Sequence, residues 1–139
     1  MLFPAFQTAS SGLGVFRTWM DAVSDNMANL DTVRPTSGPA FQARFVVAQA
    51  IGDGQQAMTG GPAGASVTGI TFGDAAGRLV SDPTNPLADA QGMVRYPDID
   101  MGEQMTQLMV AQRGYQANLS VIDRVKDAYQ QALSIGRSS

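Results

Sequence analysis

The sequence contains no cysteine and no histidine among its 139 residues. Their absence excludes disulfides, zinc sites built from Cys and His, and catalytic pairs that need a thiol or an imidazole. The chain has one lysine, Lys126, and one glutamate, Glu103. Its formal net charge is −3 and no run of like charges occurs. This charge pattern indicates neither a nucleic acid nor a membrane surface as a partner.

The polar residues offer two weak candidates for a metal site. Asp98 and Asp100 flank one residue, but they stand where helix caps are expected. Asp82, Asn85 and Asp89 lack the alternating spacing of an EF-hand loop, and the prolines among them favour turns. No constellation meets the requirements of a catalytic site. We therefore expect no enzyme activity, no catalytic residue, no cofactor, no metal and no small-molecule substrate.

The sequence also shows no long apolar run. A membrane-spanning helix needs about 20 consecutive apolar residues, and no stretch approaches that length. The segment from Met1 to Phe6 contains Pro4 and no basic residue, which is not typical of a cleavable signal peptide. We expect no membrane span and no cleaved signal.

Both ends of the chain have the pattern of long amphipathic helices. Apolar residues recur at alternating steps of three and four from Phe6 to Leu30, and again from Met101 to Leu133 with two polar interruptions. Such a seam needs a partner helix, and the nearest candidate for each seam is the other one. The residues expected to carry helix packing and assembly are Leu13, Phe16, Met20, Val23, Met27, Leu30, Met105, Leu108, Tyr115, Leu119, Ile122, Val125, Tyr129 and Leu133.

The first helix is predicted from about Pro4 to about Leu30, because proline suits a first helical turn and Pro35 prevents continuation. Gly12 and Gly14 disfavour a helix interior by roughly 1 kcal/mol each relative to alanine. Both glycines would be tolerated if another part of the backbone approached closely there.

The second helix is predicted to begin after Asp100, with Glu103 completing an acidic capping box, and to run to about Ile135 and end at Gly136. A further apolar stripe covers another face of its C-terminal half: Val121, Val125, Ala128, Ala132 and Ile135. One partner helix cannot cover two faces, so we favour assembly with other subunits. The alternative is that the stripe packs on the middle of the chain.

The middle of the chain predicts short strands and turns. Strands are expected at 41–51, 65–72, 78–80 and 93–96, with a turn at 52–54 and a loop at 59–64. The expected fold is mainly α with a small β insertion. Its terminal helical domain comprises 1–34 and 97–139, and a small β-rich middle domain comprises 35–96.

Two groups of residues resemble a known family. The segment Ser11-Gly12-Leu13, followed by Asn26, Ala28 and Asn29, resembles the N-terminal motif of bacterial flagellar rod and hook proteins, with Asp25 standing where the family usually has Asn. The run Val94-Arg95-Tyr96-Pro97, with Asp100, resembles the proximal rod proteins of that family.

The resemblance implies a structural subunit of the flagellar proximal rod. Such a protein is exported by the flagellar type III apparatus without a cleaved signal, and it polymerises helically through its terminal helices. The product is the basal-body drive shaft, which crosses the periplasm, transmits torque and encloses the export channel. Its expected partners are copies of itself, other rod proteins and the export apparatus. The alternative from a different class is a soluble helical adaptor or an export-linked binding module.

Overall fold

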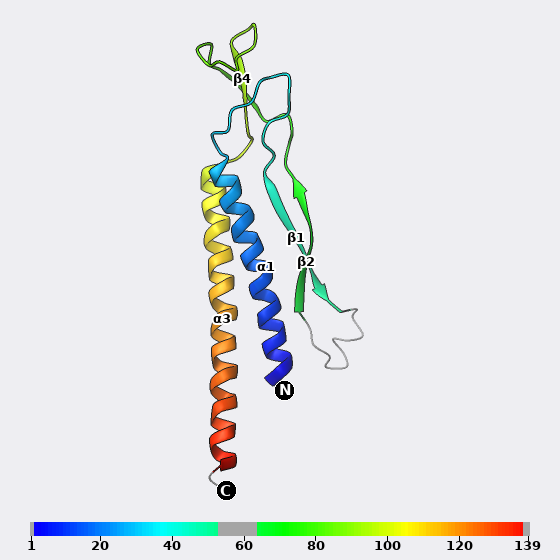
Figure 1. The fold of residues 1–139 in the computed structure, drawn as a ribbon, viewed down its shortest axis with the longest axis vertical. Coiled ribbons are helices and arrows are strands. Elements are labelled where there is room, and N and C mark those ends of the chain that lie inside the picture. The colour runs from blue at the N-terminus through cyan, green and yellow to red at the C-terminus, as the bar shows by residue number, and fades with distance from the viewer. Residues whose placement is uncertain (1, 53–63, 138–139) are drawn as a thin grey trace. The chain divides into compact units, whose positions relative to one another are not determined.

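The computed structural model describes residues 2–52 and 64–137 (Figure 1). Along the chain lie helix α1 (Leu2–Ala28), strands β1 (Arg44–Ile51), β2 (Gly64–Phe72), β3 (Arg78–Ser81) and β4 (Met93–Tyr96), and helix α3 (Met101–Arg137). Two long helices thus occupy the ends of the chain, and two small sheets lie between them in the sequence. This arrangement confirms the predicted fold class.

Helix α1 begins two residues before its predicted start and ends two residues before its predicted end. Pro4 lies within the first turn. Backbone N–H groups there have no acceptor within the helix, so a proline costs no helical hydrogen bond. At the other end the side chain of Asn29 donates to the carbonyl oxygen of Asp25 at 2.9 Å. The backbone N–H of Asn29 donates to the same carbonyl at 3.2 Å, so the side chain adds a second hydrogen bond at the end of the helix.

Helix α3 begins as predicted, because the carboxylate of Asp100 accepts the N–H of Glu103 at 2.7 Å. The carboxylate of Glu103 accepts from Gln107 at 3.3 Å, on the following turn. The prediction that Gly136 ends the helix was wrong, since α3 continues to Arg137. A glycine ends a helix by adopting a positive φ, and Gly136 does not have one.

The two sheets each contain two strands. In the β3–β4 sheet the strands are antiparallel, with Arg78 opposite Tyr96 and Ser81 opposite Met93. Gly77 precedes β3 with a φ of +58°, and a Cβ there would collide with the carbonyl oxygen of Tyr96. Glycine therefore allows both this backbone conformation and the close approach.

In the β1–β2 sheet the N–H of Gly73 donates to the carbonyl of Ala43 at 2.8 Å, just before β1 and just after β2. The predicted turn at 52–54 and loop at 59–64 lie outside the described residues, apart from Gly52 and Gly64. Gly52 has a φ of +113°, as a turn glycine can, and Gly64 begins β2.

The described residues divide into two compact units. One gathers 2–18, 48–52, 64–68 and 110–137, and the other gathers 19–47 and 69–109. Each unit therefore contains part of both long helices. The predicted division at residues 34 and 97 stays a prediction.

The second unit has the larger set of buried side chains, which includes Val23, Val94 and Ile99 with the polar Asn26 and Gln104. In the first unit the buried side chains are Ala9 and Ala111. No helix within residues 2–52 and 64–137 is long and apolar enough to span a membrane.

Candidate assembly surface

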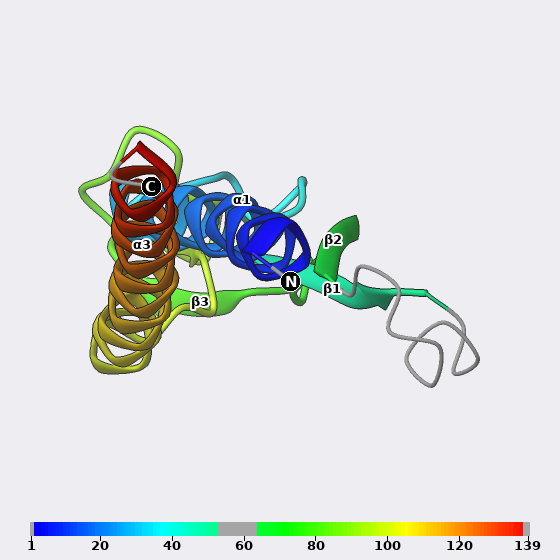
Figure 2. The ribbon, with the colours of Figure 1, turned by 90° about the horizontal axis from the view of Figure 1, so that it is seen from below.

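In the first unit α1 and α3 lie side by side at two glycines. A Cβ on Gly12 would lie 2.8 Å from Oδ1 of Asn118, and a Cβ on Gly114 would overlap the ring of Phe16. As the α1 position rises from 12 to 16, the α3 position falls from 118 to 114, so the helices are antiparallel. Figure 2 shows the two helices from below, as neighbouring coils. The glycines allow this contact because they present no side chain to the other helix.

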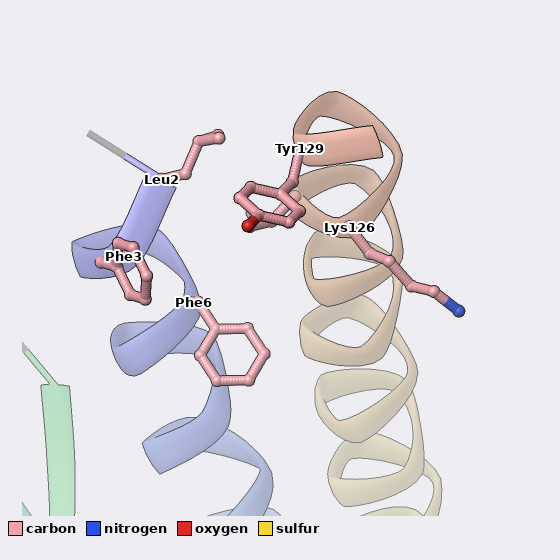
Figure 3. A pocket seen from close by; sticks show the side chains of 6 residues that line it. Leu2, Phe3, Phe6, Lys126 and Tyr129 are labelled. Carbon is pink, nitrogen blue, oxygen red and sulfur yellow. The ribbon is translucent and has the colours of Figure 1, made fainter. Parts of the chain in front are cut away.

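An apolar pocket of about 240 Å³ opens between the same helices at the N-terminal end of α1. It is lined by Leu2, Phe3, Phe6, Val125, Lys126 and Tyr129. Figure 3 shows the rings of Phe6 and Tyr129 between the helices, while the amine of Lys126 points away from α1. The pocket therefore presents aromatic carbon and contains no pair of groups suited to acid–base chemistry.

At this pocket and beyond it, α3 carries apolar side chains that this chain covers only in part. No residue of α3 from 119 to 137 is buried. Leu119 is 42% exposed, Tyr129 53% and Leu133 51%. Of the further stripe, Val125 is half-buried, whereas Val121, Ala128, Ala132 and Ile135 are exposed. The first unit thus has an apolar helix surface, which we call the α3 stripe and define as Leu119, Val121, Val125, Tyr129 and Leu133.

In the second unit polar side chains join the helices. The side chain of Asn26 donates to Oε1 of Gln104 at 3.0 Å, and both residues are almost fully buried. The indole of Trp19 donates to Oε1 of Gln107 at 3.4 Å. Sequence reasoning missed these pairs, because the apolar seam alone was used to match the helices.

The predicted packing residues range from buried to exposed. Val23 is buried; Leu13, Phe16, Met20, Met27, Leu30, Leu108, Tyr115, Ile122 and Val125 are half-buried; and Met105, Leu119, Tyr129 and Leu133 are exposed. Their role in assembly stays a prediction.

The family-motif residues lie in both units. Asn26, Val94 and Pro97 are buried; Ser11, Gly12, Leu13, Asn29, Arg95 and Tyr96 are half-buried; and Ala28 and Asp100 are exposed. Arg95 exchanges backbone hydrogen bonds with Arg34, both at 2.9 Å. Its guanidinium donates to the carbonyl oxygens of Thr36, at 3.1 Å, and Ala76. This side chain therefore ties the segment after α1 to strand β4.

Three of the acidic residues considered as metal ligands have other roles: Asp82 and Asp89 serve turns, and Asp100 caps α3. Asp82 accepts from Thr84 at 3.0 Å and from Asn85 at 3.1 Å. Asp89 accepts from the N–H of Met93, the hydroxyl of Thr36 and the N–H of Gln91, and these bonds, the one from Met93 foremost, lower the pKa of Asp89 below its ordinary 3.8. Within residues 2–52 and 64–137 no three His, Cys, Asp or Glu residues gather as a metal site would require.

Comparison with known proteins identifies the family. A family model described as the C-terminal part of flagellar basal body rod FlgEFG proteins matches residues 90–135. Over 136 residues, the flagellar basal-body rod protein FlgC of Salmonella typhimurium is 37% identical and that of Escherichia coli O6:H1 is 35% identical, each match covering 98% of both chains. The FlgC of Bacillus subtilis is 33% identical, with 97% of this chain and 98% of the relative covered. This chain belongs to the FlgC family of flagellar basal-body rod proteins.

Proposed function

We propose that this chain is a structural subunit that polymerises helically through its terminal helices to form the proximal rod of the flagellum. In this role the assembled rod transmits torque and encloses the export channel. The observation that supports assembly most directly is the α3 stripe. A helix of 37 residues is roughly 55 Å long, and its C-terminal half has no buried residue.

Physical chemistry explains why such a helix needs neighbours. A long helix in a protein takes most of its stability from packing an apolar face. The α3 stripe exposes several large side chains in consecutive turns, and contiguous apolar patches of this kind mark interaction sites. Phe3, at the start of α1 in the same unit, is 77% exposed and adds another large apolar side chain to the surface of that unit. Copies of this chain and other rod proteins are the partners that family membership suggests.

The proposal is tested by placing a charge on the stripe without disturbing the subunit. Leu133→Asp changes a side chain that is half exposed in the subunit, so the folded chain should tolerate it. In a rod, the new carboxylate would be buried against a neighbour without a partner, which is strongly unfavourable. We expect cells with Leu133→Asp as their only copy to be non-motile and to lack rods in isolated basal bodies.

Gln131→Asp is the matched control, because Gln131 is an exposed polar residue that lies about 160° around the same helix from Tyr129 and Leu133. It adds the same charge outside the stripe, and we expect motility to persist. Normal motility with Leu133→Asp would contradict assembly through the stripe. Loss of one defined partner, with rods still formed, would favour the adaptor function.

We also propose that the chain reaches the basal body through the flagellar export apparatus, without removal of a leader. The support is family membership, since the rod lies outside the cytoplasm. The first residues of α1 precede most of the seam and could be read by the apparatus. A Leu2–Gln7 deletion should leave the protein in the cytoplasm and absent from basal bodies. Normal amounts of the deleted protein in basal bodies would assign the export signal to another segment.

A further inference from the structure

One side chain of α1 pairs with the backbone at the start of β1. Oδ1 of Asn26 accepts the N–H of Arg44 at 2.7 Å, and Nδ2 of Asn26 donates to the carbonyl oxygen of Arg44 at 3.0 Å. The amide thus bonds both backbone groups of one residue, as a neighbouring strand would. The same Nδ2 also donates to Gln104 of α3. One buried amide therefore joins α1, α3 and β1.

Strand β1 buries few of its own side chains. All of its residues except Val46 are exposed, and a sheet of two strands is marginally stable by itself. The residues just before β1 are held by further polar bonds. Gln42 donates to the carbonyl of Gly73 at 2.7 Å, and the N–H of Gly73 donates to Ala43. The start of the sheet is therefore fixed mainly by directional hydrogen bonds.

The neighbouring ion pair between Asp25 and Arg44 is a weaker attachment. Both side chains are more than one-third exposed, and water and salt screen such a pair. Asn26 is 1% exposed and Gln104 is 2% exposed. Buried hydrogen bonds of this kind are costly to leave unmade. The amide of Asn26 is thus the buried polar contact between the start of β1 and the two helices.

We propose that Asn26 is a positioning residue, a polar joint that holds the start of strand β1 on the paired helices of the second unit. The inference concerns the folded subunit and does not depend on the proposed rod assembly. A related bond occurs in the first unit, where the hydroxyl oxygen of Ser11 accepts the N–H of Ala65 in β2 at 3.1 Å. Ser11 and Asn26 both belong to the family motif, and the joint gives Asn26 a function that helix packing does not explain.

Amide hydrogen exchange followed by NMR on the full chain tests the joint. In the unmodified chain, the N–H of Arg44 should be protected by its bond to Asn26. Asn26→Leu keeps a similar volume but removes that acceptor. We expect the N–H of Arg44 to exchange roughly ten- to a hundredfold faster. The N–H of Arg95, which donates to Arg34, should keep its rate because β4 is held by other contacts.

Asn29→Ala is the matched control. Asn29 lies one turn after Asn26, and within the described part of the chain its side chain bonds to Asp25 and Thr32. The rate at Arg44 should be unchanged in this variant. The proposed joint would be wrong if the N–H of Arg44 were unprotected in the unmodified chain. It would also be wrong if that N–H were equally protected in Asn26→Leu.

A second variant covers the case in which Asn26→Leu does not fold. Asn26→Asp retains an acceptor for the N–H of Arg44 but cannot donate to the Arg44 carbonyl or to Gln104. We expect faster exchange at Arg44 and Gly73, with Arg95 unaffected. Uniform acceleration that includes Arg95 would show that Asn26 supports the whole unit and would contradict a local joint.

Discussion

Two glycines in the long helices provide a direct test of how closely α1 and α3 approach. Gly114 of α3 faces the ring of Phe16, and a Cβ at Gly114 would overlap that ring. Gly14 of α1 has no atom within 4 Å of the position that a Cβ would occupy. Alanine at each position should therefore change the stability by different amounts, although the chemical change is the same.

Two terms determine the change in the free energy of unfolding of each variant. In a helix interior, glycine to alanine is worth about 1 kcal/mol in favour of folding, and this term is common to both variants. Gly114→Ala adds the cost of inserting a methyl group into a packed contact, about 1–3 kcal/mol. The difference between the two variants isolates this steric cost. We expect Gly14→Ala to be stabilising and Gly114→Ala to be less stable than it by about 1–3 kcal/mol.

Urea unfolding of the purified chain, followed by circular dichroism, measures this difference from the two midpoints. The m-values should agree, since neither substitution changes the surface exposed on unfolding by much. If Gly114→Ala proved as stable as Gly14→Ala, the close contact between Phe16 and α3 would be refuted, and with it the antiparallel pairing deduced from that contact.

Two further predictions concern the loop regions. Hydrogen bonds lower the pKa of Asp89 in the fold, so its stabilising contribution is present above its ordinary pKa of 3.8 and is lost as the pH falls through the lower folded value. Asp89→Asn should flatten the acid side of the stability curve in pH-dependent unfolding, and an unchanged curve would contradict this role. Gly77→Ala should destabilise the chain by at least about 1 kcal/mol, because Gly77 combines a positive φ with close approach to Tyr96. A midpoint of thermal unfolding equal to that of the unmodified chain would disprove this prediction.

The sequence predicted the helices well because apolar periodicity and capping are local signals. The alternating steps located α1 and α3, and Asp100 located the start of α3. The strand at 93–96 matched β4, and 65–72 missed only the first residue of β2. These features depend on residues close together in the chain.

Features that depend on tertiary approach were harder to predict. A close approach of another backbone was the explanation considered for Gly12 and Gly14. A Cβ at Gly12 would instead meet the side chain of Asn118, and a Cβ at Gly14 would meet no atom within 4 Å. The hydrogen bond between Asn26 and Gln104 was missed for the same reason. A polar residue in a helix does not indicate its partner until the helices are aligned.

Imaging of the intact basal body by electron cryomicroscopy tests the proposed assembly most directly. At a resolution that shows side chains, we expect this chain to lie in the proximal rod, with Leu119, Tyr129 and Leu133 buried against α-helices of neighbouring subunits. A rod in which these three side chains face solvent or the open export channel would contradict assembly through the α3 stripe.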